Sequence, residues 1–106
     1  MTKKRPGTIY GRRLREARES YGFSQENLGI ATGLDESGAG GRVSRYETGA
    51  HQPKLGMQQL FAEALALPLA YFYIEDDEAA RLIANSARSD KPVQLRIEIE
   101  NRRKRK

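Results

Sequence analysis

Several residue types that often carry chemistry are scarce in this chain. It has 106 residues, with no cysteine, no tryptophan and a single histidine, His51. Without cysteine there is neither a disulfide framework nor a thiolate metal site, and one histidine cannot build a zinc site. Long hydrophobic runs are missing too, because the longest mainly apolar stretch, residues 65–74, contains Pro68 and is too short to span a bilayer. The basic N-terminus lacks a following apolar segment, so we expect a cytoplasmic protein without metal, cofactor or membrane anchor.

Positive charge is concentrated near the two ends of the chain. Residues 1–56 hold ten basic and six acidic side chains, residues 57–90 hold two and six, and residues 91–106 hold seven and two. Basic segments around an acidic middle are typical of a protein that binds a polyanion such as nucleic acid. Solvated tails are the alternative explanation of the same pattern.

The first half of the sequence predicts three helices separated by glycine-containing turns. Residues 9–21 carry apolar side chains at helical spacing, and Gly22 follows in the position of a left-handed helix stop. Ser24 is a good N-cap for a second helix, which Gly33 closes. A third helix ends at residues 47–49, again with glycine in the stop position.

The second half predicts a fourth helix, a short aromatic turn and a further helix. Pro53 is expected to begin the fourth helix, since proline fits a first helical turn. Its expected buried residues are Leu55, Leu60, Phe61, Ala64 and Leu65. Pro68 opens the aromatic turn at residues 69–73. Acidic residues 76–78 suit the start of the last helix, whose expected apolar edge is Ala79, Leu82, Ile83 and Ala87.

The C-terminal segment alternates between apolar and polar residues, which predicts a half-buried β-strand over residues 91–101. One strand cannot satisfy its own backbone, so we expect it to pair with the same strand of a second copy. Antiparallel pairing centred on Ile97 sets Arg96 opposite Glu98 of the partner, whereas a shifted register opposes like charges. The expected dimerisation residues are Val93, Leu95, Arg96, Ile97, Glu98 and Ile99. Docking of this tail on its own domain is the alternative.

Residues 9–74 resemble the Cro/repressor-type helix-turn-helix proteins, also called the xenobiotic-response-element family. The matching residues are Arg13-Leu14-Arg15, Arg18, Gly22, Ser24-Gln25-Glu26, Leu28, Gly33-Leu34, Val43-Ser44-Arg45-Tyr46-Glu47, Gly49, Pro53 and Glu63-Ala64-Leu65. The resemblance implies an all-α, five-helix lambda-repressor-like DNA-binding domain at residues 9–74. Around it we expect a basic arm at 1–8, a helix at 75–90, the dimerisation strand at 91–101 and a basic tail at 102–106.

The resemblance also implies roles for single residues. Gln25 matches the position that grips a DNA phosphate at the start of the second helix. Arg18 and Glu47 match a structural salt bridge between the first helix and the end of the recognition helix. Val43 matches a core position, and Gly29 matches a site where the second and third helices cross closely.

Base reading is expected on the face of the third helix opposite Val43 and Glu47. Arginine suits guanine because its planar fork bonds O6 and N7 together, so Arg42 and Arg45 are the main candidates, and Ser44 is expected at a phosphate or flanking base. The alternative for each arginine is a phosphate contact without sequence reading. The full set of candidate DNA-binding residues is Gln25, Gly38, Gly40, Gly41, Arg42, Ser44 and Arg45.

Residues 35–41 are the main departure from the family pattern, which has about four fewer residues here. Four residues are about one helical turn, or roughly 6 Å, so the insertion can lengthen the recognition helix without rotating its outer face. Glycine inside a helix costs about 1 kcal/mol relative to alanine. We therefore expect residues 36–41 to become helical only when DNA binds.

The function that follows is a sequence-specific regulator of transcription that binds double-stranded DNA at a pseudo-palindromic operator as a homodimer. Its small size leaves no room for a separate activation domain, which favours a repressor. An antitoxin-like module, whose C-terminal strand and tail bind a partner protein, is the alternative. An enzyme is disfavoured because no nucleophile accompanies His51. RNA binding lacks the aromatic stacking pattern of a sheet-based module.

Overall fold

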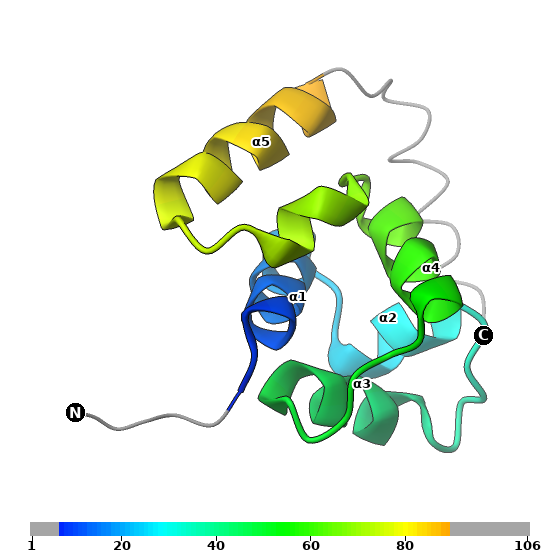
Figure 1. The fold of residues 1–106 in the computed structure, drawn as a ribbon. Coiled ribbons are helices and arrows are strands. Elements are labelled where there is room, and N and C mark those ends of the chain that lie inside the picture. Colours follow the sequence, from blue (N-terminus) through cyan, green and yellow to red (C-terminus); the bar gives the residue numbers. More distant parts are fainter. Residues whose placement is uncertain (1–6, 90–106) are drawn as a thin grey trace.

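The computed structural model describes residues 7–89, and their regular structure is entirely helical (Figure 1). The elements are α1 (Ile9–Ser20), α2 (Gln25–Ala31), α3 (Ala39–Thr48), α4 (Leu55–Leu65), the 3-10 helix η1 (Leu69–Tyr73) and α5 (Asp77–Ser89). The order agrees with the helices expected from the sequence. The expected strand at 91–101, with Val93, Leu95, Arg96, Ile97, Glu98 and Ile99, lies outside the described residues, as do the tail at 102–106 and most of the arm at 1–8.

Polar caps and glycines set the helix ends. Thr8 Oγ1 accepts a hydrogen bond from Gly11 N at 2.9 Å, and Ser24 Oγ accepts one from Asn27 N at 2.9 Å. Thr8 is therefore the N-cap of α1, although the expected N-terminal arm included this residue. Gly33 has a φ of +97° just after α2, a conformation that suits glycine because it has no Cβ.

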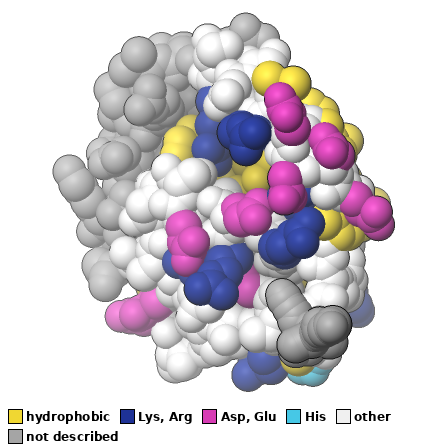
Figure 2. Space-filling view, turned by 90° about the vertical axis from the view of Figure 1, so that its left-hand side faces the viewer, with side chains coloured by type: hydrophobic (Ala, Val, Ile, Leu, Met, Phe, Trp, Pro, Cys, Tyr) yellow, Lys and Arg dark blue, Asp and Glu magenta, His cyan; other side chains and the backbone are white. Residues whose placement is uncertain are grey.

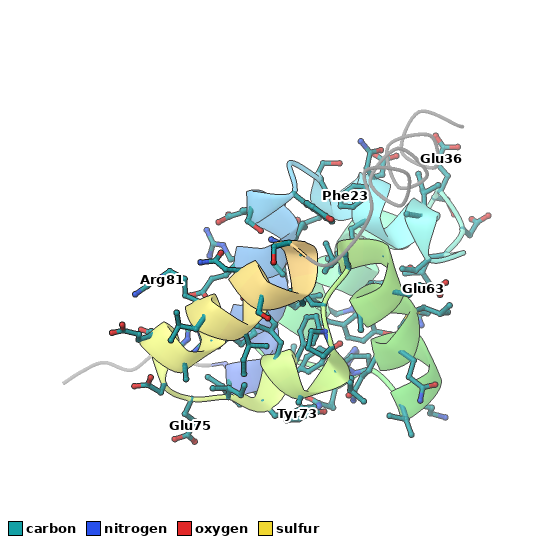
Figure 3. The ribbon with its side chains drawn as sticks, turned by 90° about the horizontal axis from the view of Figure 1, so that it is seen from above. Phe23, Glu36, Glu63, Tyr73, Glu75 and Arg81 are labelled. Carbon is teal, nitrogen blue, oxygen red and sulfur yellow. The ribbon has the colours of Figure 1, made fainter. Side chains whose placement is uncertain are left out.

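The core lies where α1 packs between the α2–α3 pair and η1 (Figure 1). The ring of Tyr10 in α1 packs at a tilt against the rings of Phe72 and Tyr73 in η1, with centroids 5.2 and 5.5 Å apart. The acidic side chains of Glu36, Glu63 and Glu75 point away from this core (Figure 3). The buried aromatic and aliphatic residues of the described helices form one hydrophobic core.

The start and the buried face of α4 differ from expectation. The helix begins at Leu55 after the N-cap Lys54, and Pro53 is buried ahead of it. Leu55 and Leu60 are 58% and 42% exposed, so placing them in the core was wrong. At about 100° per residue they lie on opposite flanks of the face centred on Phe61. The residues buried on α4 are Gln58, Phe61, Ala62, Ala64 and Leu65.

Arg13 joins the N-terminal end of α5 to α1, although it is a charged residue buried to 1% exposure. Its guanidinium donates to the carbonyls of Ile74 and Glu75 at 2.9 and 3.0 Å, and to the carboxylates of Asp77 and Glu16 at 2.9 and 2.8 Å. The hydrogen bond from Arg13 holds the pKa of the Asp77 carboxyl below its ordinary value, so the carboxylate stays charged at a lower pH than a free aspartate. A buried cation with this many acceptors is fully compensated.

Arg88 attaches the other end of α5. It lies over the ring of Tyr21 at 4.2 Å and donates to Ser20 Oγ at 2.9 Å and to the Leu65 carbonyl at 3.1 Å. Between these two ends α5 is only partly covered, and Leu82, expected on its apolar edge, is 61% exposed. No helix among the described residues is long and apolar enough to span a membrane.

Candidate nucleic-acid interface

Helices α2 and α3 cross closely at a glycine. A Cβ placed on Gly29 would lie 2.8 Å from the Cβ of Ala39, and Ala39 is fully buried. A side chain at position 29 would therefore push the start of α3 away from α2. This contact fixes how α3 is presented at the surface of the domain.

The turn between α2 and α3 absorbs most of the insertion. The Gly38 amide donates to the Asp35 carbonyl at 3.1 Å, and the Asp35 carboxylate accepts hydrogen bonds from the amide and the hydroxyl of Ser37. These local bonds favour a turn over a helix. α3 begins at Ala39, so residues 39–41 already form its first turn without DNA, contrary to the expectation that 36–41 become helical only when DNA binds. Residues 36–38 are not helical, and their ordering on DNA stays a prediction.

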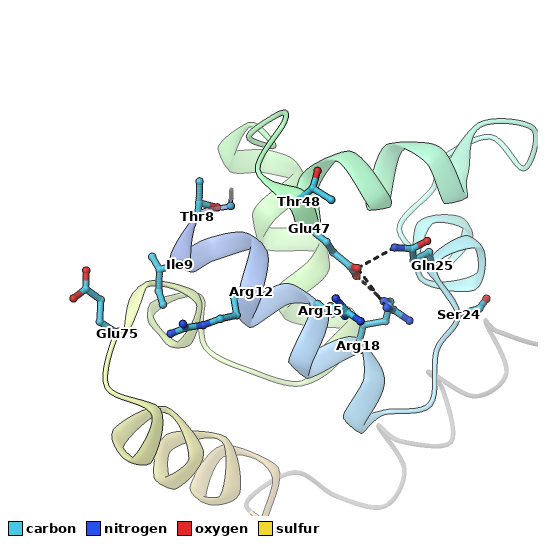
Figure 4. A pocket seen from close by; sticks show the side chains of 11 residues that line it. Thr8, Ile9, Arg12, Arg15, Arg18, Ser24, Gln25, Glu47, Thr48 and Glu75 are labelled. Carbon is cyan, nitrogen blue, oxygen red and sulfur yellow. Dashed lines mark hydrogen bonds and ion pairs between the residues drawn. The ribbon is translucent and has the colours of Figure 1, made fainter. Parts of the chain in front are cut away.

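A buried ion pair ties α1 to the end of α3. Arg18 Nε donates to Glu47 Oε2 at 2.6 Å and Arg18 Nη2 donates to Glu47 Oε1 at 3.3 Å (Figure 4). The two side chains are 11% and 4% exposed. Arg18 Nη1 also donates to the Phe23 carbonyl at 2.9 Å. Two hydrogen bonds between charged groups therefore hold the C-terminal end of α3 against α1.

Gln25 joins this network instead of pointing freely into solvent. Its Nε2 donates to Glu47 Oε1 at 3.0 Å, so one of its two amide protons is occupied (Figure 4). The second N–H can still donate to a phosphate oxygen. Glu47 thereby connects residues from α1, α2 and α3.

Gly11 is a structural requirement that the sequence reasoning missed. A Cβ at this position would lie 2.5 Å from the Glu47 carbonyl oxygen and 2.7 Å from that of Tyr46. Because Gly11 has no side chain, the backbone of α1 can lie in direct contact with the backbone of α3. A glycine inside an otherwise helical pattern is the signal that could have revealed it.

The outer face of α3 carries the candidate base-reading residues. Buried positions of the helix are Ala39, Val43, Tyr46 and Glu47. We call the opposite side the α3 face; its exposed members are Gly41, Arg42, Arg45 and Thr48, with Ser44 half-buried. Gly38 is the exposed N-cap of the helix, and Gly40 is half-buried near Glu26 of α2.

The two arginines on the α3 face have different surroundings. Arg42 donates from Nε and Nη2 to the Tyr46 hydroxyl at 3.2 and 3.0 Å. The guanidinium of Arg45 lies over Gly41, where a Cβ would be 3.5 Å from Nη1. The sequence assigned no separate role to Tyr46, which is only one of the residues that carry the family resemblance.

Other polar groups border the α3 face. His51, for which the sequence suggested no role, is exposed and donates its backbone amide to the Arg45 carbonyl at 3.2 Å. It follows the end of α3 and extends the polar surface there.

A cleft of about 950 Å³ lies between α1, the start of α2 and the end of α3 (Figure 4). Arg12 and Arg15 line it with side chains that are 48% and 65% exposed, and they pair with Asp77 and Glu19 at 3.4 and 3.2 Å. Figure 2 shows such basic and acidic side chains side by side on this face. Exposed pairs of this kind contribute little energy, so both guanidinium groups can turn to a phosphate.

Comparison with known proteins agrees with this geometry. The model of a family described as a helix-turn-helix domain matches residues 9–70. The crystal structure of the transcriptional regulator BswR is similar, with a TM-score of 0.71 and 34% sequence identity over 86% of this chain and 88% of that chain. No curated protein matches. On these grounds the chain belongs to the helix-turn-helix family of DNA-binding transcriptional regulators.

Proposed function

We propose that this protein is a repressor that binds a pseudo-palindromic operator as a homodimer, with α3 in the major groove. The observation that carries the proposal is the division of α3 into a buried side and the α3 face with its exposed Arg42 and Arg45. A helix held from behind by a core can enter a groove about 12 Å wide without losing its own contacts. A bound dimer excludes other proteins from the same DNA.

The proposed complex has two kinds of contact, one to base edges and one to phosphates. Arg45, and Arg42 on the flank of the helix, read guanine through O6 and N7. The second N–H of Gln25 and the guanidinium groups of Arg12 and Arg15 bind phosphates, which position the helix without reading sequence. The cleft lined by these two arginines leaves room for the sugar-phosphate backbone.

Selection from a random duplex pool tests the base-reading role. We expect a palindromic consensus with half-sites about 34 Å apart. Changing Arg45→Ala should cost about 1–3 kcal/mol of discrimination at one base pair of each half-site. The matched control Arg15→Ala should instead weaken all sequences alike and reduce the log–log salt slope by about 0.9. Full base preference in Arg45→Ala would refute the reading mechanism.

Pairing of the 91–101 segments between two copies is the proposed basis of the dimer. Changing Ile97→Lys puts a charge at the centre of the proposed apolar face, so we expect monomers in sedimentation. Gln94→Lys adds the same charge on the polar side and should leave the dimer intact. Dimers of Ile97→Lys that are as stable as the unaltered protein would rule out the strand as the dimer contact.

A further inference from the structure

We propose that Tyr46 is a positioning residue for sequence recognition, because its hydroxyl holds the Arg42 guanidinium in the orientation that reads DNA. The inference rests on the proposed function, since it assumes that Arg42 contacts a base edge. The two residues are four positions apart on α3, the spacing at which side chains of a helix meet. Arg42 Nε and Nη2 both donate to Tyr46 Oη, at 3.2 and 3.0 Å.

The Tyr46 hydroxyl is a fixed acceptor because the ring beneath it is held by the core. Tyr46 is only 7% exposed, and its ring meets that of Phe61 edge to face with the centroids 5.9 Å apart. A tyrosine has few rotatable bonds, so packing of its ring also fixes its hydroxyl. An exposed arginine would otherwise sample many rotamers, and ordering it on binding would reduce affinity.

The hydrogen bonds to Tyr46 also select which edge of the guanidinium faces outward. They occupy the side formed by Nε and Nη2, which leaves both protons of Nη1 and the second proton of Nη2. These protons form the end of the fork and can bond O6 and N7 of one guanine together. Among the ion pairs of the described residues none includes Arg42, so no paired carboxylate has to be displaced when its guanidinium binds DNA.

A hydroxyl acceptor suits this task better than a carboxylate would. Glu47 on the same helix is already paired with Arg18, and that pair is buried. A neutral oxygen orients the guanidinium through hydrogen bonds without cancelling its charge. Tyr46 thus combines two separable roles, with the ring serving the core and the hydroxyl serving recognition.

Tyr46→Phe tests the hydroxyl alone, because phenylalanine keeps the ring. Tyr73→Phe is the matched control: Tyr73 Oη donates to Gln58 Oε1 at 2.7 Å, and Tyr73 belongs to η1, not to α3. Both variants and Arg42→Ala are compared by selection from a random duplex pool and by thermal unfolding. We expect Tyr46→Phe to lower discrimination roughly threefold to tenfold, because the two hydrogen bonds from Arg42 lose their shared acceptor oxygen. The loss should fall at the base pair where Arg42→Ala abolishes preference, and Tyr73→Phe should keep full preference.

The outcomes separate this inference from the function on which it rests. If Arg42→Ala loses preference at one base pair while Tyr46→Phe keeps it, Tyr46 does not position the arginine and only the inference fails. Equal weakening on all sequences by Tyr46→Phe also overturns it, since that pattern indicates a general structural effect. If Arg42→Ala itself retains every preference, base reading by Arg42 fails and the positioning role fails with it.

Discussion

The substitution Glu47→Ala is expected to lower the free energy of unfolding by about 3–5 kcal/mol, because it removes the buried counter-ion of Arg18. The Arg18 guanidinium would keep only the longer ion pair with the exposed carboxylate of Glu19, at 3.7 Å. Arg18 is only 11% exposed in its side chain, and Gln25 would lose its acceptor at the same time. Denaturant unfolding measures the loss. Glu63→Ala, at an exposed position of α4, is the control for replacing glutamate by alanine in a helix.

A double-mutant cycle identifies the origin of this effect. If the charged pair is responsible, Arg18→Ala combined with Glu47→Ala should cost clearly less than the sum of the two single changes. Additive losses would show that each side chain acts through other contacts. A loss below about 1 kcal/mol in Glu47→Ala would place the pair among ordinary surface salt bridges.

Gly11→Ala is expected to destabilise the domain by about 1–3 kcal/mol, although alanine is the better helix former. The added methyl would lie 2.5 Å from the Glu47 carbonyl oxygen, and backbone atoms of α3 cannot turn aside as a side chain can. α1 and α3 would have to separate. We expect weaker DNA binding as well, because the C-terminal end of α3 shifts.

Gly56→Ala is the matched control for this change. Gly56 also lies in a helix, and a Cβ there meets no atom within 4 Å. Its replacement should therefore raise stability by up to about 1 kcal/mol. If Gly11→Ala behaves like Gly56→Ala in thermal unfolding, the close contact between α1 and α3 is not required.

Local signals in the sequence were sufficient to predict most of the helices. Ser24 and Gly33 bound α2 because a cap and a left-handed stop act within a few residues of the chain. The spacing of Arg18 and Glu47 predicted a salt bridge only through the family resemblance, and the structure contains it. Local capping signals therefore predicted the helices, and the family resemblance predicted the salt bridge that joins α1 to α3.

Features that depend on contacts between distant segments were not predictable in the same way. Gly11 is required because it lies against the backbone of Glu47, 36 positions further along the chain. No local sequence rule predicts a contact over that separation. Gln25 meets Glu47 only because α2 and α3 cross. The exposure of Leu60 follows from which side of α4 the rest of the domain covers.

The buried side of α3 packs against the rest of the domain, whereas Arg45 on its outer side is exposed and supports no part of the core. If Arg45 reads the operator as proposed, substitutions at this outward position should change which operator is preferred while the fold stays intact. Arg42 is less free to vary, because a new residue there would abandon the hydroxyl of Tyr46. Under the proposed function, new DNA-binding preferences in relatives should therefore arise from single changes at position 45 and from joint changes at positions 42 and 46.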